Sequence, residues 1–178
     1  VTRKITRGLT RINVGLDSCI FLGNLDAKRD WGHAKDYVRM QWLMLQQEIP
    51  EDYVIATGRT ETIKKFIEIC SIKLNWNKKP DEAGIIWEGE GIEEIGRRAD
   101  TNEIVIKIDP RYFRPTEVDE LVGDSKKGFL KLGWVPEITL EEMIEEMLTK
   151  DKNKALEESI LLKKGFKVNN RFESPPQN

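Results

Sequence analysis

The stretch Ile104-Val105-Ile106-Lys107-Ile108-Asp109-Pro110 predicts a strand that ends at an Asp-Pro break. Apart from Lys107, residues 104–108 are apolar and β-branched, which is typical of a strand. A second short apolar run, residues 19–22, ends in the turn Gly23-Asn24 and predicts another strand. Helical patterns lie between these runs and beside them, so the sequence predicts an α/β fold.

Two more runs predict strands, over residues 53–56 and 85–87. The run at 53–56 is apolar at almost every position, as expected for a strand that is covered on both faces in a parallel sheet. Residues 88–101 are acidic and rich in glycine. We expect them to form a solvated loop without a function of its own.

Apolar residues three or four positions apart predict the helices. The helix that reaches residue 47 can begin at Asp30 or Asp36, and it is apolar on several sides, so it is predicted to be buried. Thr139 and Glu142 form a capping-box pattern before the last long helix. The predicted helices cover residues 2–16, 30 or 36 to 47, 60 or 62 to 74, 115–121, 126–132 and 139–148, with the pattern resuming at 160–164.

Composition excludes several classes of protein. The chain has 178 residues, with 29 Lys and Arg against 31 Asp and Glu, and a nucleic-acid binder shows a basic excess. The two cysteines are far apart without zinc-ligand spacing, which favours a reducing cytoplasm. No apolar run is long enough for a membrane span, and the first residues do not resemble a signal peptide. The first residue is not Met, so we expect the chain to begin inside a longer or processed one. One domain is expected over residues 1–168, followed by a polar tail over 169–178.

Familiar catalytic motifs are missing from the sequence. It contains no phosphate-binding P-loop, no G-x-S-x-G and no H-E-x-x-H. Gly89-Glu90-Gly91 has no third glycine in register and predicts an ordinary loop. His33, the only histidine, is predicted to be structural or solvated, and Cys19 and Cys70 are predicted to be core thiols.

Two arginines are the better candidates for a binding site. Arg29 precedes a predicted helix, and Arg114 follows the strand at 104–108. Ligands of α/β folds bind at the carboxyl ends of strands, where a guanidinium can clamp a phosphate with two hydrogen bonds. Glu117 could accept hydrogen bonds from the hydroxyls of a ribose or hexose. The alternative is that the arginines form structural ion pairs, with Asp30, Asp36 or Asp119 as partners.

The same region resembles a known family. Residues 29–38 are similar to the R-D-W-G-H-A-x-D-Y-V segment of GDP-mannose 4,6-dehydratases. The resemblance runs from Val1 to about Gly165, and its motifs follow the family's order and spacing. The other matching segments are residues 1–7, 40–47, 53–58, 109–115, 121–124 and 131–140.

The resemblance implies the C-terminal part of an extended Rossmann-type short-chain dehydrogenase/reductase, comprising the substrate-binding subdomain and the last sheet strands. The family binds NADP on its N-terminal half and converts GDP-mannose to GDP-4-keto-6-deoxymannose, toward GDP-fucose. By resemblance, Val1 and Lys4 lie against the guanosine diphosphate. Arg29 and Arg114 bind the diphosphate, and Glu117 contacts a ribose hydroxyl.

The sequence departs from the family in one large respect. It has no glycine-rich dinucleotide loop, and none of its three tyrosines has a lysine four positions later. No catalytic residue is therefore assigned, and we expect the chain not to turn over GDP-mannose by itself. Two alternatives stay open: a related GDP-sugar reductase or epimerase, and a non-catalytic module that binds a nucleotide sugar or docks on a relative. Apolar edges are expected to be covered by the missing Rossmann half or by other copies of the chain.

Overall fold

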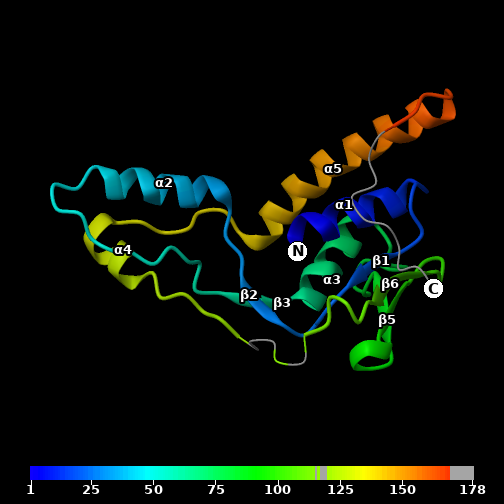
Figure 1. Cartoon of the computed structure of the whole chain (residues 1–178), viewed down its shortest axis with the longest axis horizontal. Helices are drawn as coiled ribbons and strands as arrows, with labels where there is room; N and C mark the ends of the chain where they lie inside the picture. The colour runs from blue at the N-terminus through cyan, green and yellow to red at the C-terminus, as the bar shows by residue number, and fades with distance from the viewer. Residues whose placement is uncertain (115, 117–119, 169–178) are drawn as a thin grey trace.

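The computed structural model describes residues 1–114, 116 and 120–168. Its main sheet has four strands in the order β1-β6-β5-β4 (Figure 1). The strands are β1 (Ile20–Leu22), β4 (Ile85–Glu88), β5 (Ile95–Arg98) and β6 (Ile104–Ile108). β1 and β6 are parallel, while β5 is antiparallel to both of its neighbours. Helices connect the two parallel strands along the chain, which confirms the predicted α/β class.

β5 corrects the prediction for residues 88–101. This segment forms the short helix η1 (Gly91–Glu93) and then β5, which lies inside the sheet between β6 and β4. A Cβ at Gly96 would lie 3.2 Å from the Cβ of Ile106 and 2.9 Å from the ring of Trp87. Glycine is therefore the residue that lets β5 lie close to its neighbours, although in the sequence it indicates a loop.

A second sheet, which was not predicted, pairs β2 (Lys28–Asp30) with β3 (Thr60–Thr62) in antiparallel fashion. The strand predicted at 53–56 is wrong, because this segment has no strand partner among the described residues. The chain that follows this segment is held by a side chain instead of a strand: the Asp30 carboxylate accepts the backbone N–H groups of Thr57 and Gly58, each at 2.9 Å. Val54 is half exposed.

Three helices pack on one another and on the sheet: α1 (Thr2–Asn13), α3 (Ile63–Lys73) and α5 (Leu140–Lys163). The Oγ1 of Thr62 caps α3 by accepting the Lys65 N–H at 2.9 Å. The predicted capping box at Thr139 and Glu142 is confirmed, and α5 then continues without a break for 24 residues. The helices predicted at 2–16 and 60–74 are confirmed, with ends shifted by one to three residues.

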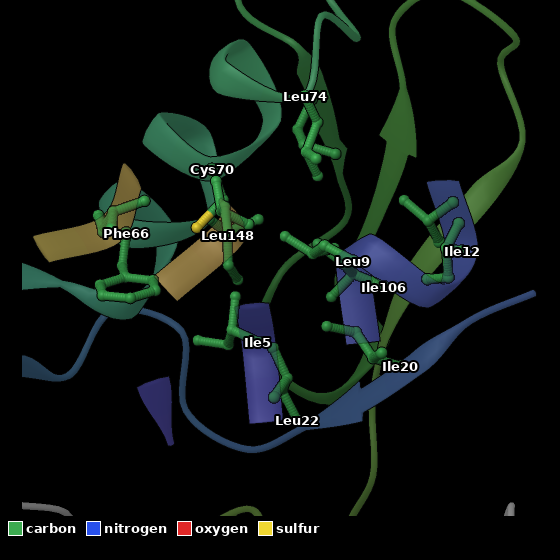
Figure 2. Packing of buried hydrophobic residues seen from close by; sticks show 14 of the residues in the cluster. Ile5, Leu9, Ile12, Ile20, Leu22, Phe66, Cys70, Leu74, Ile106 and Leu148 are labelled. Atoms are coloured by element: carbon green, nitrogen blue, oxygen red, sulfur yellow. The ribbon is translucent and has the colours of Figure 1, made fainter. Parts of the chain in front are cut away.

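The core lies between these helices and the sheet (Figure 2). Ile5 and Leu9 of α1, Phe66 of α3 and Ile106 of β6 are completely buried. α1 lies directly against β1, because a Cβ added at Gly8 would stand only 2.3 Å from the Cγ2 of Ile20. The other buried apolar residues of this cluster are Ile12, Ile20, Leu22, Leu25, Ile67, Cys70, Leu74, Trp76, Ile85, Val105, Ile108, Leu140, Met143, Ile144 and Leu148.

Buried polar contacts join α1 to α5. The Thr6 hydroxyl donates to the Asp151 carboxylate at 2.7 Å, and the Arg3 guanidinium lies 3.0 Å from the same carboxylate. One turn and a half along α1, Arg11 forms an ion pair with Glu158. The Asp151 side chain is only 2% exposed, so these partners replace the water that its carboxylate would otherwise bind.

The helices α2 (Ala34–Leu45) and α4 (Lys126–Leu132) lie apart from this core (Figure 1). α4 has the bounds that the sequence predicts. α2 begins after His33, whose Nδ1 accepts the Lys35 N–H at 3.1 Å, so the structural interpretation of His33 is supported.

The predicted burial of the helix at 30–47 is wrong. Within α2 only Asp36 and Met40 are buried. Trp42 is 59% exposed and Leu45 is 82% exposed. The residues packed against α2 cover only one of its apolar sides. The second side is exposed, and Phe129 and Leu130 of the neighbouring helix α4 are exposed too.

Among the described residues, no helix combines the length and apolar character that a membrane span requires. The helix predicted at 115–121 and the tail at 169–178 fall wholly or largely outside the described residues. The boundary between a domain at 1–168 and a tail therefore stays a prediction.

Candidate functional site

The candidate site lies at the carboxyl ends of the two parallel strands β1 and β6. Their pairing continues past the last strand residues, because the Asp109 N–H donates to the Leu22 carbonyl at 2.8 Å. A Cβ at Gly23 would lie 2.2 Å from the Tyr112 carbonyl oxygen. The two chain segments that leave the sheet here therefore stay in contact for several residues.

Asp109 organises the segment that follows β6. Its backbone carbonyl accepts the N–H groups of Tyr112 at 2.9 Å and Phe113 at 3.2 Å. Its carboxylate accepts the Arg111 N–H at 2.9 Å and the Arg111 Nη2 at 2.6 Å. These hydrogen bonds from Arg111 hold the pKa of Asp109 below its ordinary value. The side chain of Asp109 is 2% exposed, so its charge is held in a fixed place.

Arg114 is held by its backbone. The side-chain amide of Asn24 donates from Nδ2 to the Arg114 carbonyl at 2.9 Å, and the Arg114 N–H donates to Oδ1 of Asn24 at 2.8 Å. Arg114 itself is exposed. The structure therefore fixes the main chain at Arg114 at the edge of the molecule.

Lys4 reaches the same edge from α1. Its Nζ lies 4.0 Å from the centre of the Tyr112 ring, and the guanidinium carbon of Arg111 lies 5.6 Å from it. Val1 is the residue before α1, is 55% exposed, and its carbonyl accepts the Ile5 N–H at 3.1 Å. Lys4 and Arg111 therefore contact one ring two residues before Arg114, an arrangement that suits an anionic ligand.

Arg29 lies elsewhere, on β2. It lines a cavity of about 190 Å³ between the β2–β3 pair and the chain that enters α5. One wall is Trp31, whose ring packs edge-on against Phe66 with centroids 5.0 Å apart. The cavity is lined by Arg29, Trp31, Thr57, Arg59, Glu61, Pro136, Glu137, Ile138, Thr139 and Leu140.

Two of the three predicted ion-pair partners of the arginines, Asp30 and Asp36, bind backbone groups of nearby loops. The Asp30 carboxylate accepts hydrogen bonds from the loop at 57–58, as described above. The Asp36 carboxylate accepts the N–H groups of Glu137 at 3.1 Å and Ile138 at 3.0 Å. Asp119 lies outside the described residues. The carboxylates of Asp30 and Asp36 thus serve to fix loops of the backbone.

The structure brings only some of the predicted residues together. Lys4 and Arg114 approach one edge, with Val1 at the start of the same helix, whereas Arg29 belongs to the second sheet. The segment after Arg114 returns to that sheet, because Glu120 accepts the Thr60 hydroxyl at 2.6 Å and lies 3.6 Å from the Lys28 amine. Glu117 lies outside the described residues.

Sequence reasoning missed three residues of the site: Asn24, Asp109 and Arg111. The turn Gly23-Asn24 and the break Asp109-Pro110 are visible in the sequence, but they were interpreted only as the ends of strands. Both cysteines are free thiols whose pKa values are raised by burial, to about 11 for Cys19. Cys70 is a core thiol as predicted, whereas Cys19 is only partly buried and lies outside the core cluster. The raised pKa values fit inert thiols better than nucleophiles.

The described residues offer no group of three or more ligating side chains that could hold a metal ion. Gly89 follows β4 and Gly91 begins the three-residue helix η1, so they do not form the loop between a strand and a long helix that holds a dinucleotide. The residues present therefore do not fit an NADP site.

Solved structures show which class of fold this is. RMD from Pseudomonas aeruginosa, solved as a complex with NADPH, aligns with a TM-score of 0.65 and 18% identity over 86% of this chain and 42% of its own. UDP-glucose 4-epimerase from Bifidobacterium longum aligns with a TM-score of 0.56 and 17% identity, over 84% of this chain and 39% of its own. The fold is that of part of an extended short-chain dehydrogenase/reductase.

Sequence comparison is more specific. The profile of the GDP-mannose 4,6 dehydratase family matches residues 1–147, and the chain belongs to this family. GDP-mannose 4,6-dehydratase of Yersinia enterocolitica is 48% identical over 98% of this chain and 48% of its own length. The human GDP-mannose 4,6 dehydratase is 46% identical over 85% of this chain and 39% of its own. The chain thus spans about half the length of the curated relatives it matches.

Proposed function

We propose that this chain is the sugar-nucleotide-binding part of an NADP-dependent GDP-mannose 4,6-dehydratase that works in the cytoplasm. In this proposal Val1 and Lys4 contact the guanosine diphosphate, and Arg29 and Arg114 bind its phosphates. Glu117, outside the described residues, completes the site at a ribose hydroxyl. Membership of the family and the placement of Arg114 at the carboxyl end of β6 support the proposal.

The observation that carries the proposal is the grouping of cations at that edge. Lys4 and Arg111 contact the Tyr112 ring, and Arg114 is fixed two residues further on. A guanidinium on a fixed backbone can donate two parallel hydrogen bonds to a phosphate. A diphosphate presents enough oxygens for several such donors. The site can thus bind and orient a nucleotide.

The chain's own residues supply binding and not the redox step. NADP would carry the hydride in the full reaction. Because this sequence contains neither the Tyr–Lys pair nor a fitting dinucleotide loop, we derive no step through the cofactor. We expect purified chain to bind GDP-mannose without forming a keto sugar.

Titration calorimetry with GDP tests the binding. We expect Arg114→Ala to weaken GDP at least about tenfold, since a charge-assisted hydrogen bond contributes roughly 1.5–3 kcal/mol. The matched control is Arg97→Ala, an arginine of β5 that binds Glu88 at 3.0 Å and lies in a different part of the sheet. Equal GDP affinity in the unchanged chain and Arg114→Ala would contradict the proposal.

We also propose what covers the apolar face of α2 and α4. α2 and α4 contact each other, and we refer to their exposed apolar side chains, Trp42, Leu45, Phe129 and Leu130, together as this face. Residues 53–56 lie nearby as an extended segment without a strand partner among the described residues. Since the chain spans about half of its relatives, we assign the face to the nucleotide-binding half that those relatives carry.

Co-expression with the first half of the Yersinia enterocolitica relative tests this assignment. We expect the two chains to co-purify, and Trp42→Glu to abolish the complex because it places a charge in an apolar interface. Ile72→Glu, on the exposed side of α3, is the matched control and should leave the complex intact. A homodimer that Trp42→Glu dissolves, without binding to the other half, would instead assign the face to a second copy.

A non-catalytic module that binds a nucleotide sugar is the second candidate. The absence of the Tyr–Lys pair from the sequence favours it for the isolated chain. The two candidates differ in one measurement. A reconstituted complex of both halves that converts GDP-mannose supports the dehydratase, whereas binding of GDP-mannose without turnover in that complex supports the module.

A further inference from the structure

We propose that Asn24 is a positioning residue whose side-chain amide sets the place of Arg114 for the nucleotide diphosphate. The inference rests on the proposed function, because it assumes that Arg114 binds phosphate. Asn24 itself need not touch the ligand. It acts through the main chain of the arginine.

The first support is the way the two segments leave the sheet. Three successive residues of the first segment approach the second one. The Leu22 carbonyl accepts the Asp109 N–H at 2.8 Å, and position 23 has no room for a Cβ beside the Tyr112 carbonyl. Asn24 then binds both backbone groups of Arg114. The contact between the segments is thus continuous from the end of the strands to Arg114.

The second support is the chemistry of the asparagine side chain. Its planar amide offers one acceptor and two donors, so it can replace the peptide group of a neighbouring strand. Here it accepts the Arg114 N–H at 2.8 Å and donates to the Arg114 carbonyl at 2.9 Å. The side chain therefore adds one rung to the pairing of β1 and β6. An aspartate at position 24 could still accept the Arg114 N–H, but it would place a second oxygen, which cannot donate, against the Arg114 carbonyl.

The two hydrogen bonds from Asn24 preorganise the main chain of Arg114 for ligand binding. An exposed arginine on a free loop must be ordered when it binds, and that ordering lowers its affinity for a ligand. A main chain held at two points leaves only the side chain of Arg114 to be ordered. Removing the amide therefore weakens nucleotide binding by way of Arg114 and not by loss of a direct contact.

Amide hydrogen exchange in the full 178-residue chain tests the clamp without any ligand. In Asn24→Ala we expect the Arg114 amide to exchange at least about tenfold faster, because its acceptor is gone. The amides of Tyr112 and Phe113, which donate to Asp109, should change little. Asn77→Ala is the matched control, since its Nδ2 donates to the Lys79 carbonyl at 2.6 Å in a separate loop. Unchanged exchange at Arg114 would overturn the proposal.

A double-mutant cycle tests the route of the effect. We expect Asn24→Ala to weaken GDP binding about fivefold, which corresponds to about one net hydrogen bond. In a chain that already carries Arg114→Ala, we expect Asn24→Ala to have no further effect on GDP affinity. If Asn24→Ala weakens GDP binding equally with Arg114 and with alanine at position 114, the positioning role is overturned, and Arg114 remains a phosphate-binding residue. If Arg114→Ala binds GDP as tightly as the unchanged chain, the proposed function is overturned. The exchange experiment then still tests whether Asn24 holds the main chain of Arg114.

Asn24→Asp keeps the test open if the alanine variant does not fold. It retains an acceptor for the Arg114 N–H, so we expect the amide to stay protected while GDP affinity falls as the carbonyl loses its donor. Unreduced GDP affinity in Asn24→Asp would contradict the two-point clamp.

Discussion

The Nζ of Lys4 lies 4.0 Å from the centre of the Tyr112 ring. This contact joins the first helix to the segment after the last strand of the sheet. A lysine over an aromatic face is attracted by the negative face of the ring. The ring therefore holds the amine of Lys4 beside the segment that leads to Arg114.

The first prediction concerns that ring. Tyr112→Phe keeps an aromatic face under Lys4, so we expect its affinity for GDP to stay within about twofold of the unchanged chain. Tyr112→Ala removes the face, and we expect GDP affinity to fall about two- to fivefold, the scale of a cation–π contact at an exposed site. Titration calorimetry measures both. A loss in Tyr112→Phe as large as in Tyr112→Ala would show that the hydroxyl matters and not the ring face.

The second prediction concerns the link between α1 and α5. Thr6→Val removes the hydroxyl that donates to the buried carboxylate of Asp151, and we expect the free energy of unfolding to fall by about 1–3 kcal/mol. Thr10→Val is the control on the same helix, because the Thr10 hydroxyl donates only to carbonyls of α1, those of Thr6 and Arg7. We expect it to cost less. Urea unfolding measures both, and equal costs would argue against a special role of the Thr6–Asp151 bond.

The third prediction concerns the core. Phe66 is fully buried and packs edge-on against Trp31. Phe66→Ala should lower the free energy of unfolding by about 3–5 kcal/mol through lost burial and a new cavity. Phe129→Ala, with a side chain that is 55% exposed, should change it by less than about 0.5 kcal/mol in the isolated chain. Urea unfolding followed by tryptophan fluorescence gives the comparison. Similar losses would mean that Phe129 is buried in solution.

The fourth prediction concerns pH. Hydrogen bonds from Lys127 and then Lys131 lower the pKa of Glu51 to about 2, from an ordinary value of 4.5. Because the pKa is lower in the folded chain, these ion pairs stabilise the fold above pH 4.5, and their contribution is lost as the pH falls toward 2. An NMR titration of the Glu51 carboxyl should therefore have its midpoint near 2. In a chain with Lys127→Met and Lys131→Met the midpoint should return toward 4.5, and a midpoint that stays low would exclude the lysines as its cause.

Much of the fold could be predicted from local patterns. The helix at Thr62, the capping box at Thr139 and the strand that ends at Asp109 each depend on nearby residues, and the structure confirms them. β5 was missed because Gly96, which indicates a loop in sequence, is here a packing requirement against Trp87 and Ile106. Such a requirement is visible only when the neighbouring strands are in place.

The errors at residues 53–56 and along α2 have one physical cause. Their apolar pattern predicts burial on more than one side, whereas the described residues cover one side only. A pattern reports how much surface a segment is suited to bury, and it does not report which chain provides the cover. The sequence indicates Arg114 as a candidate but not Asn24, because a hydrogen-bond partner ninety residues away leaves no local pattern.

Gly8 connects the two walls of the candidate site. Since a Cβ at this position would overlap the Ile20 side chain, α1 can lie this close to β1 only because residue 8 has no side chain. Lys4 lies one turn before Gly8, and Asn24 lies just beyond the strand that Gly8 touches. The closeness of this contact therefore fixes where Lys4 lies relative to Asn24. A single added methyl group at this contact would push α1 away from β1 and would move Lys4 relative to the segment that Asn24 holds.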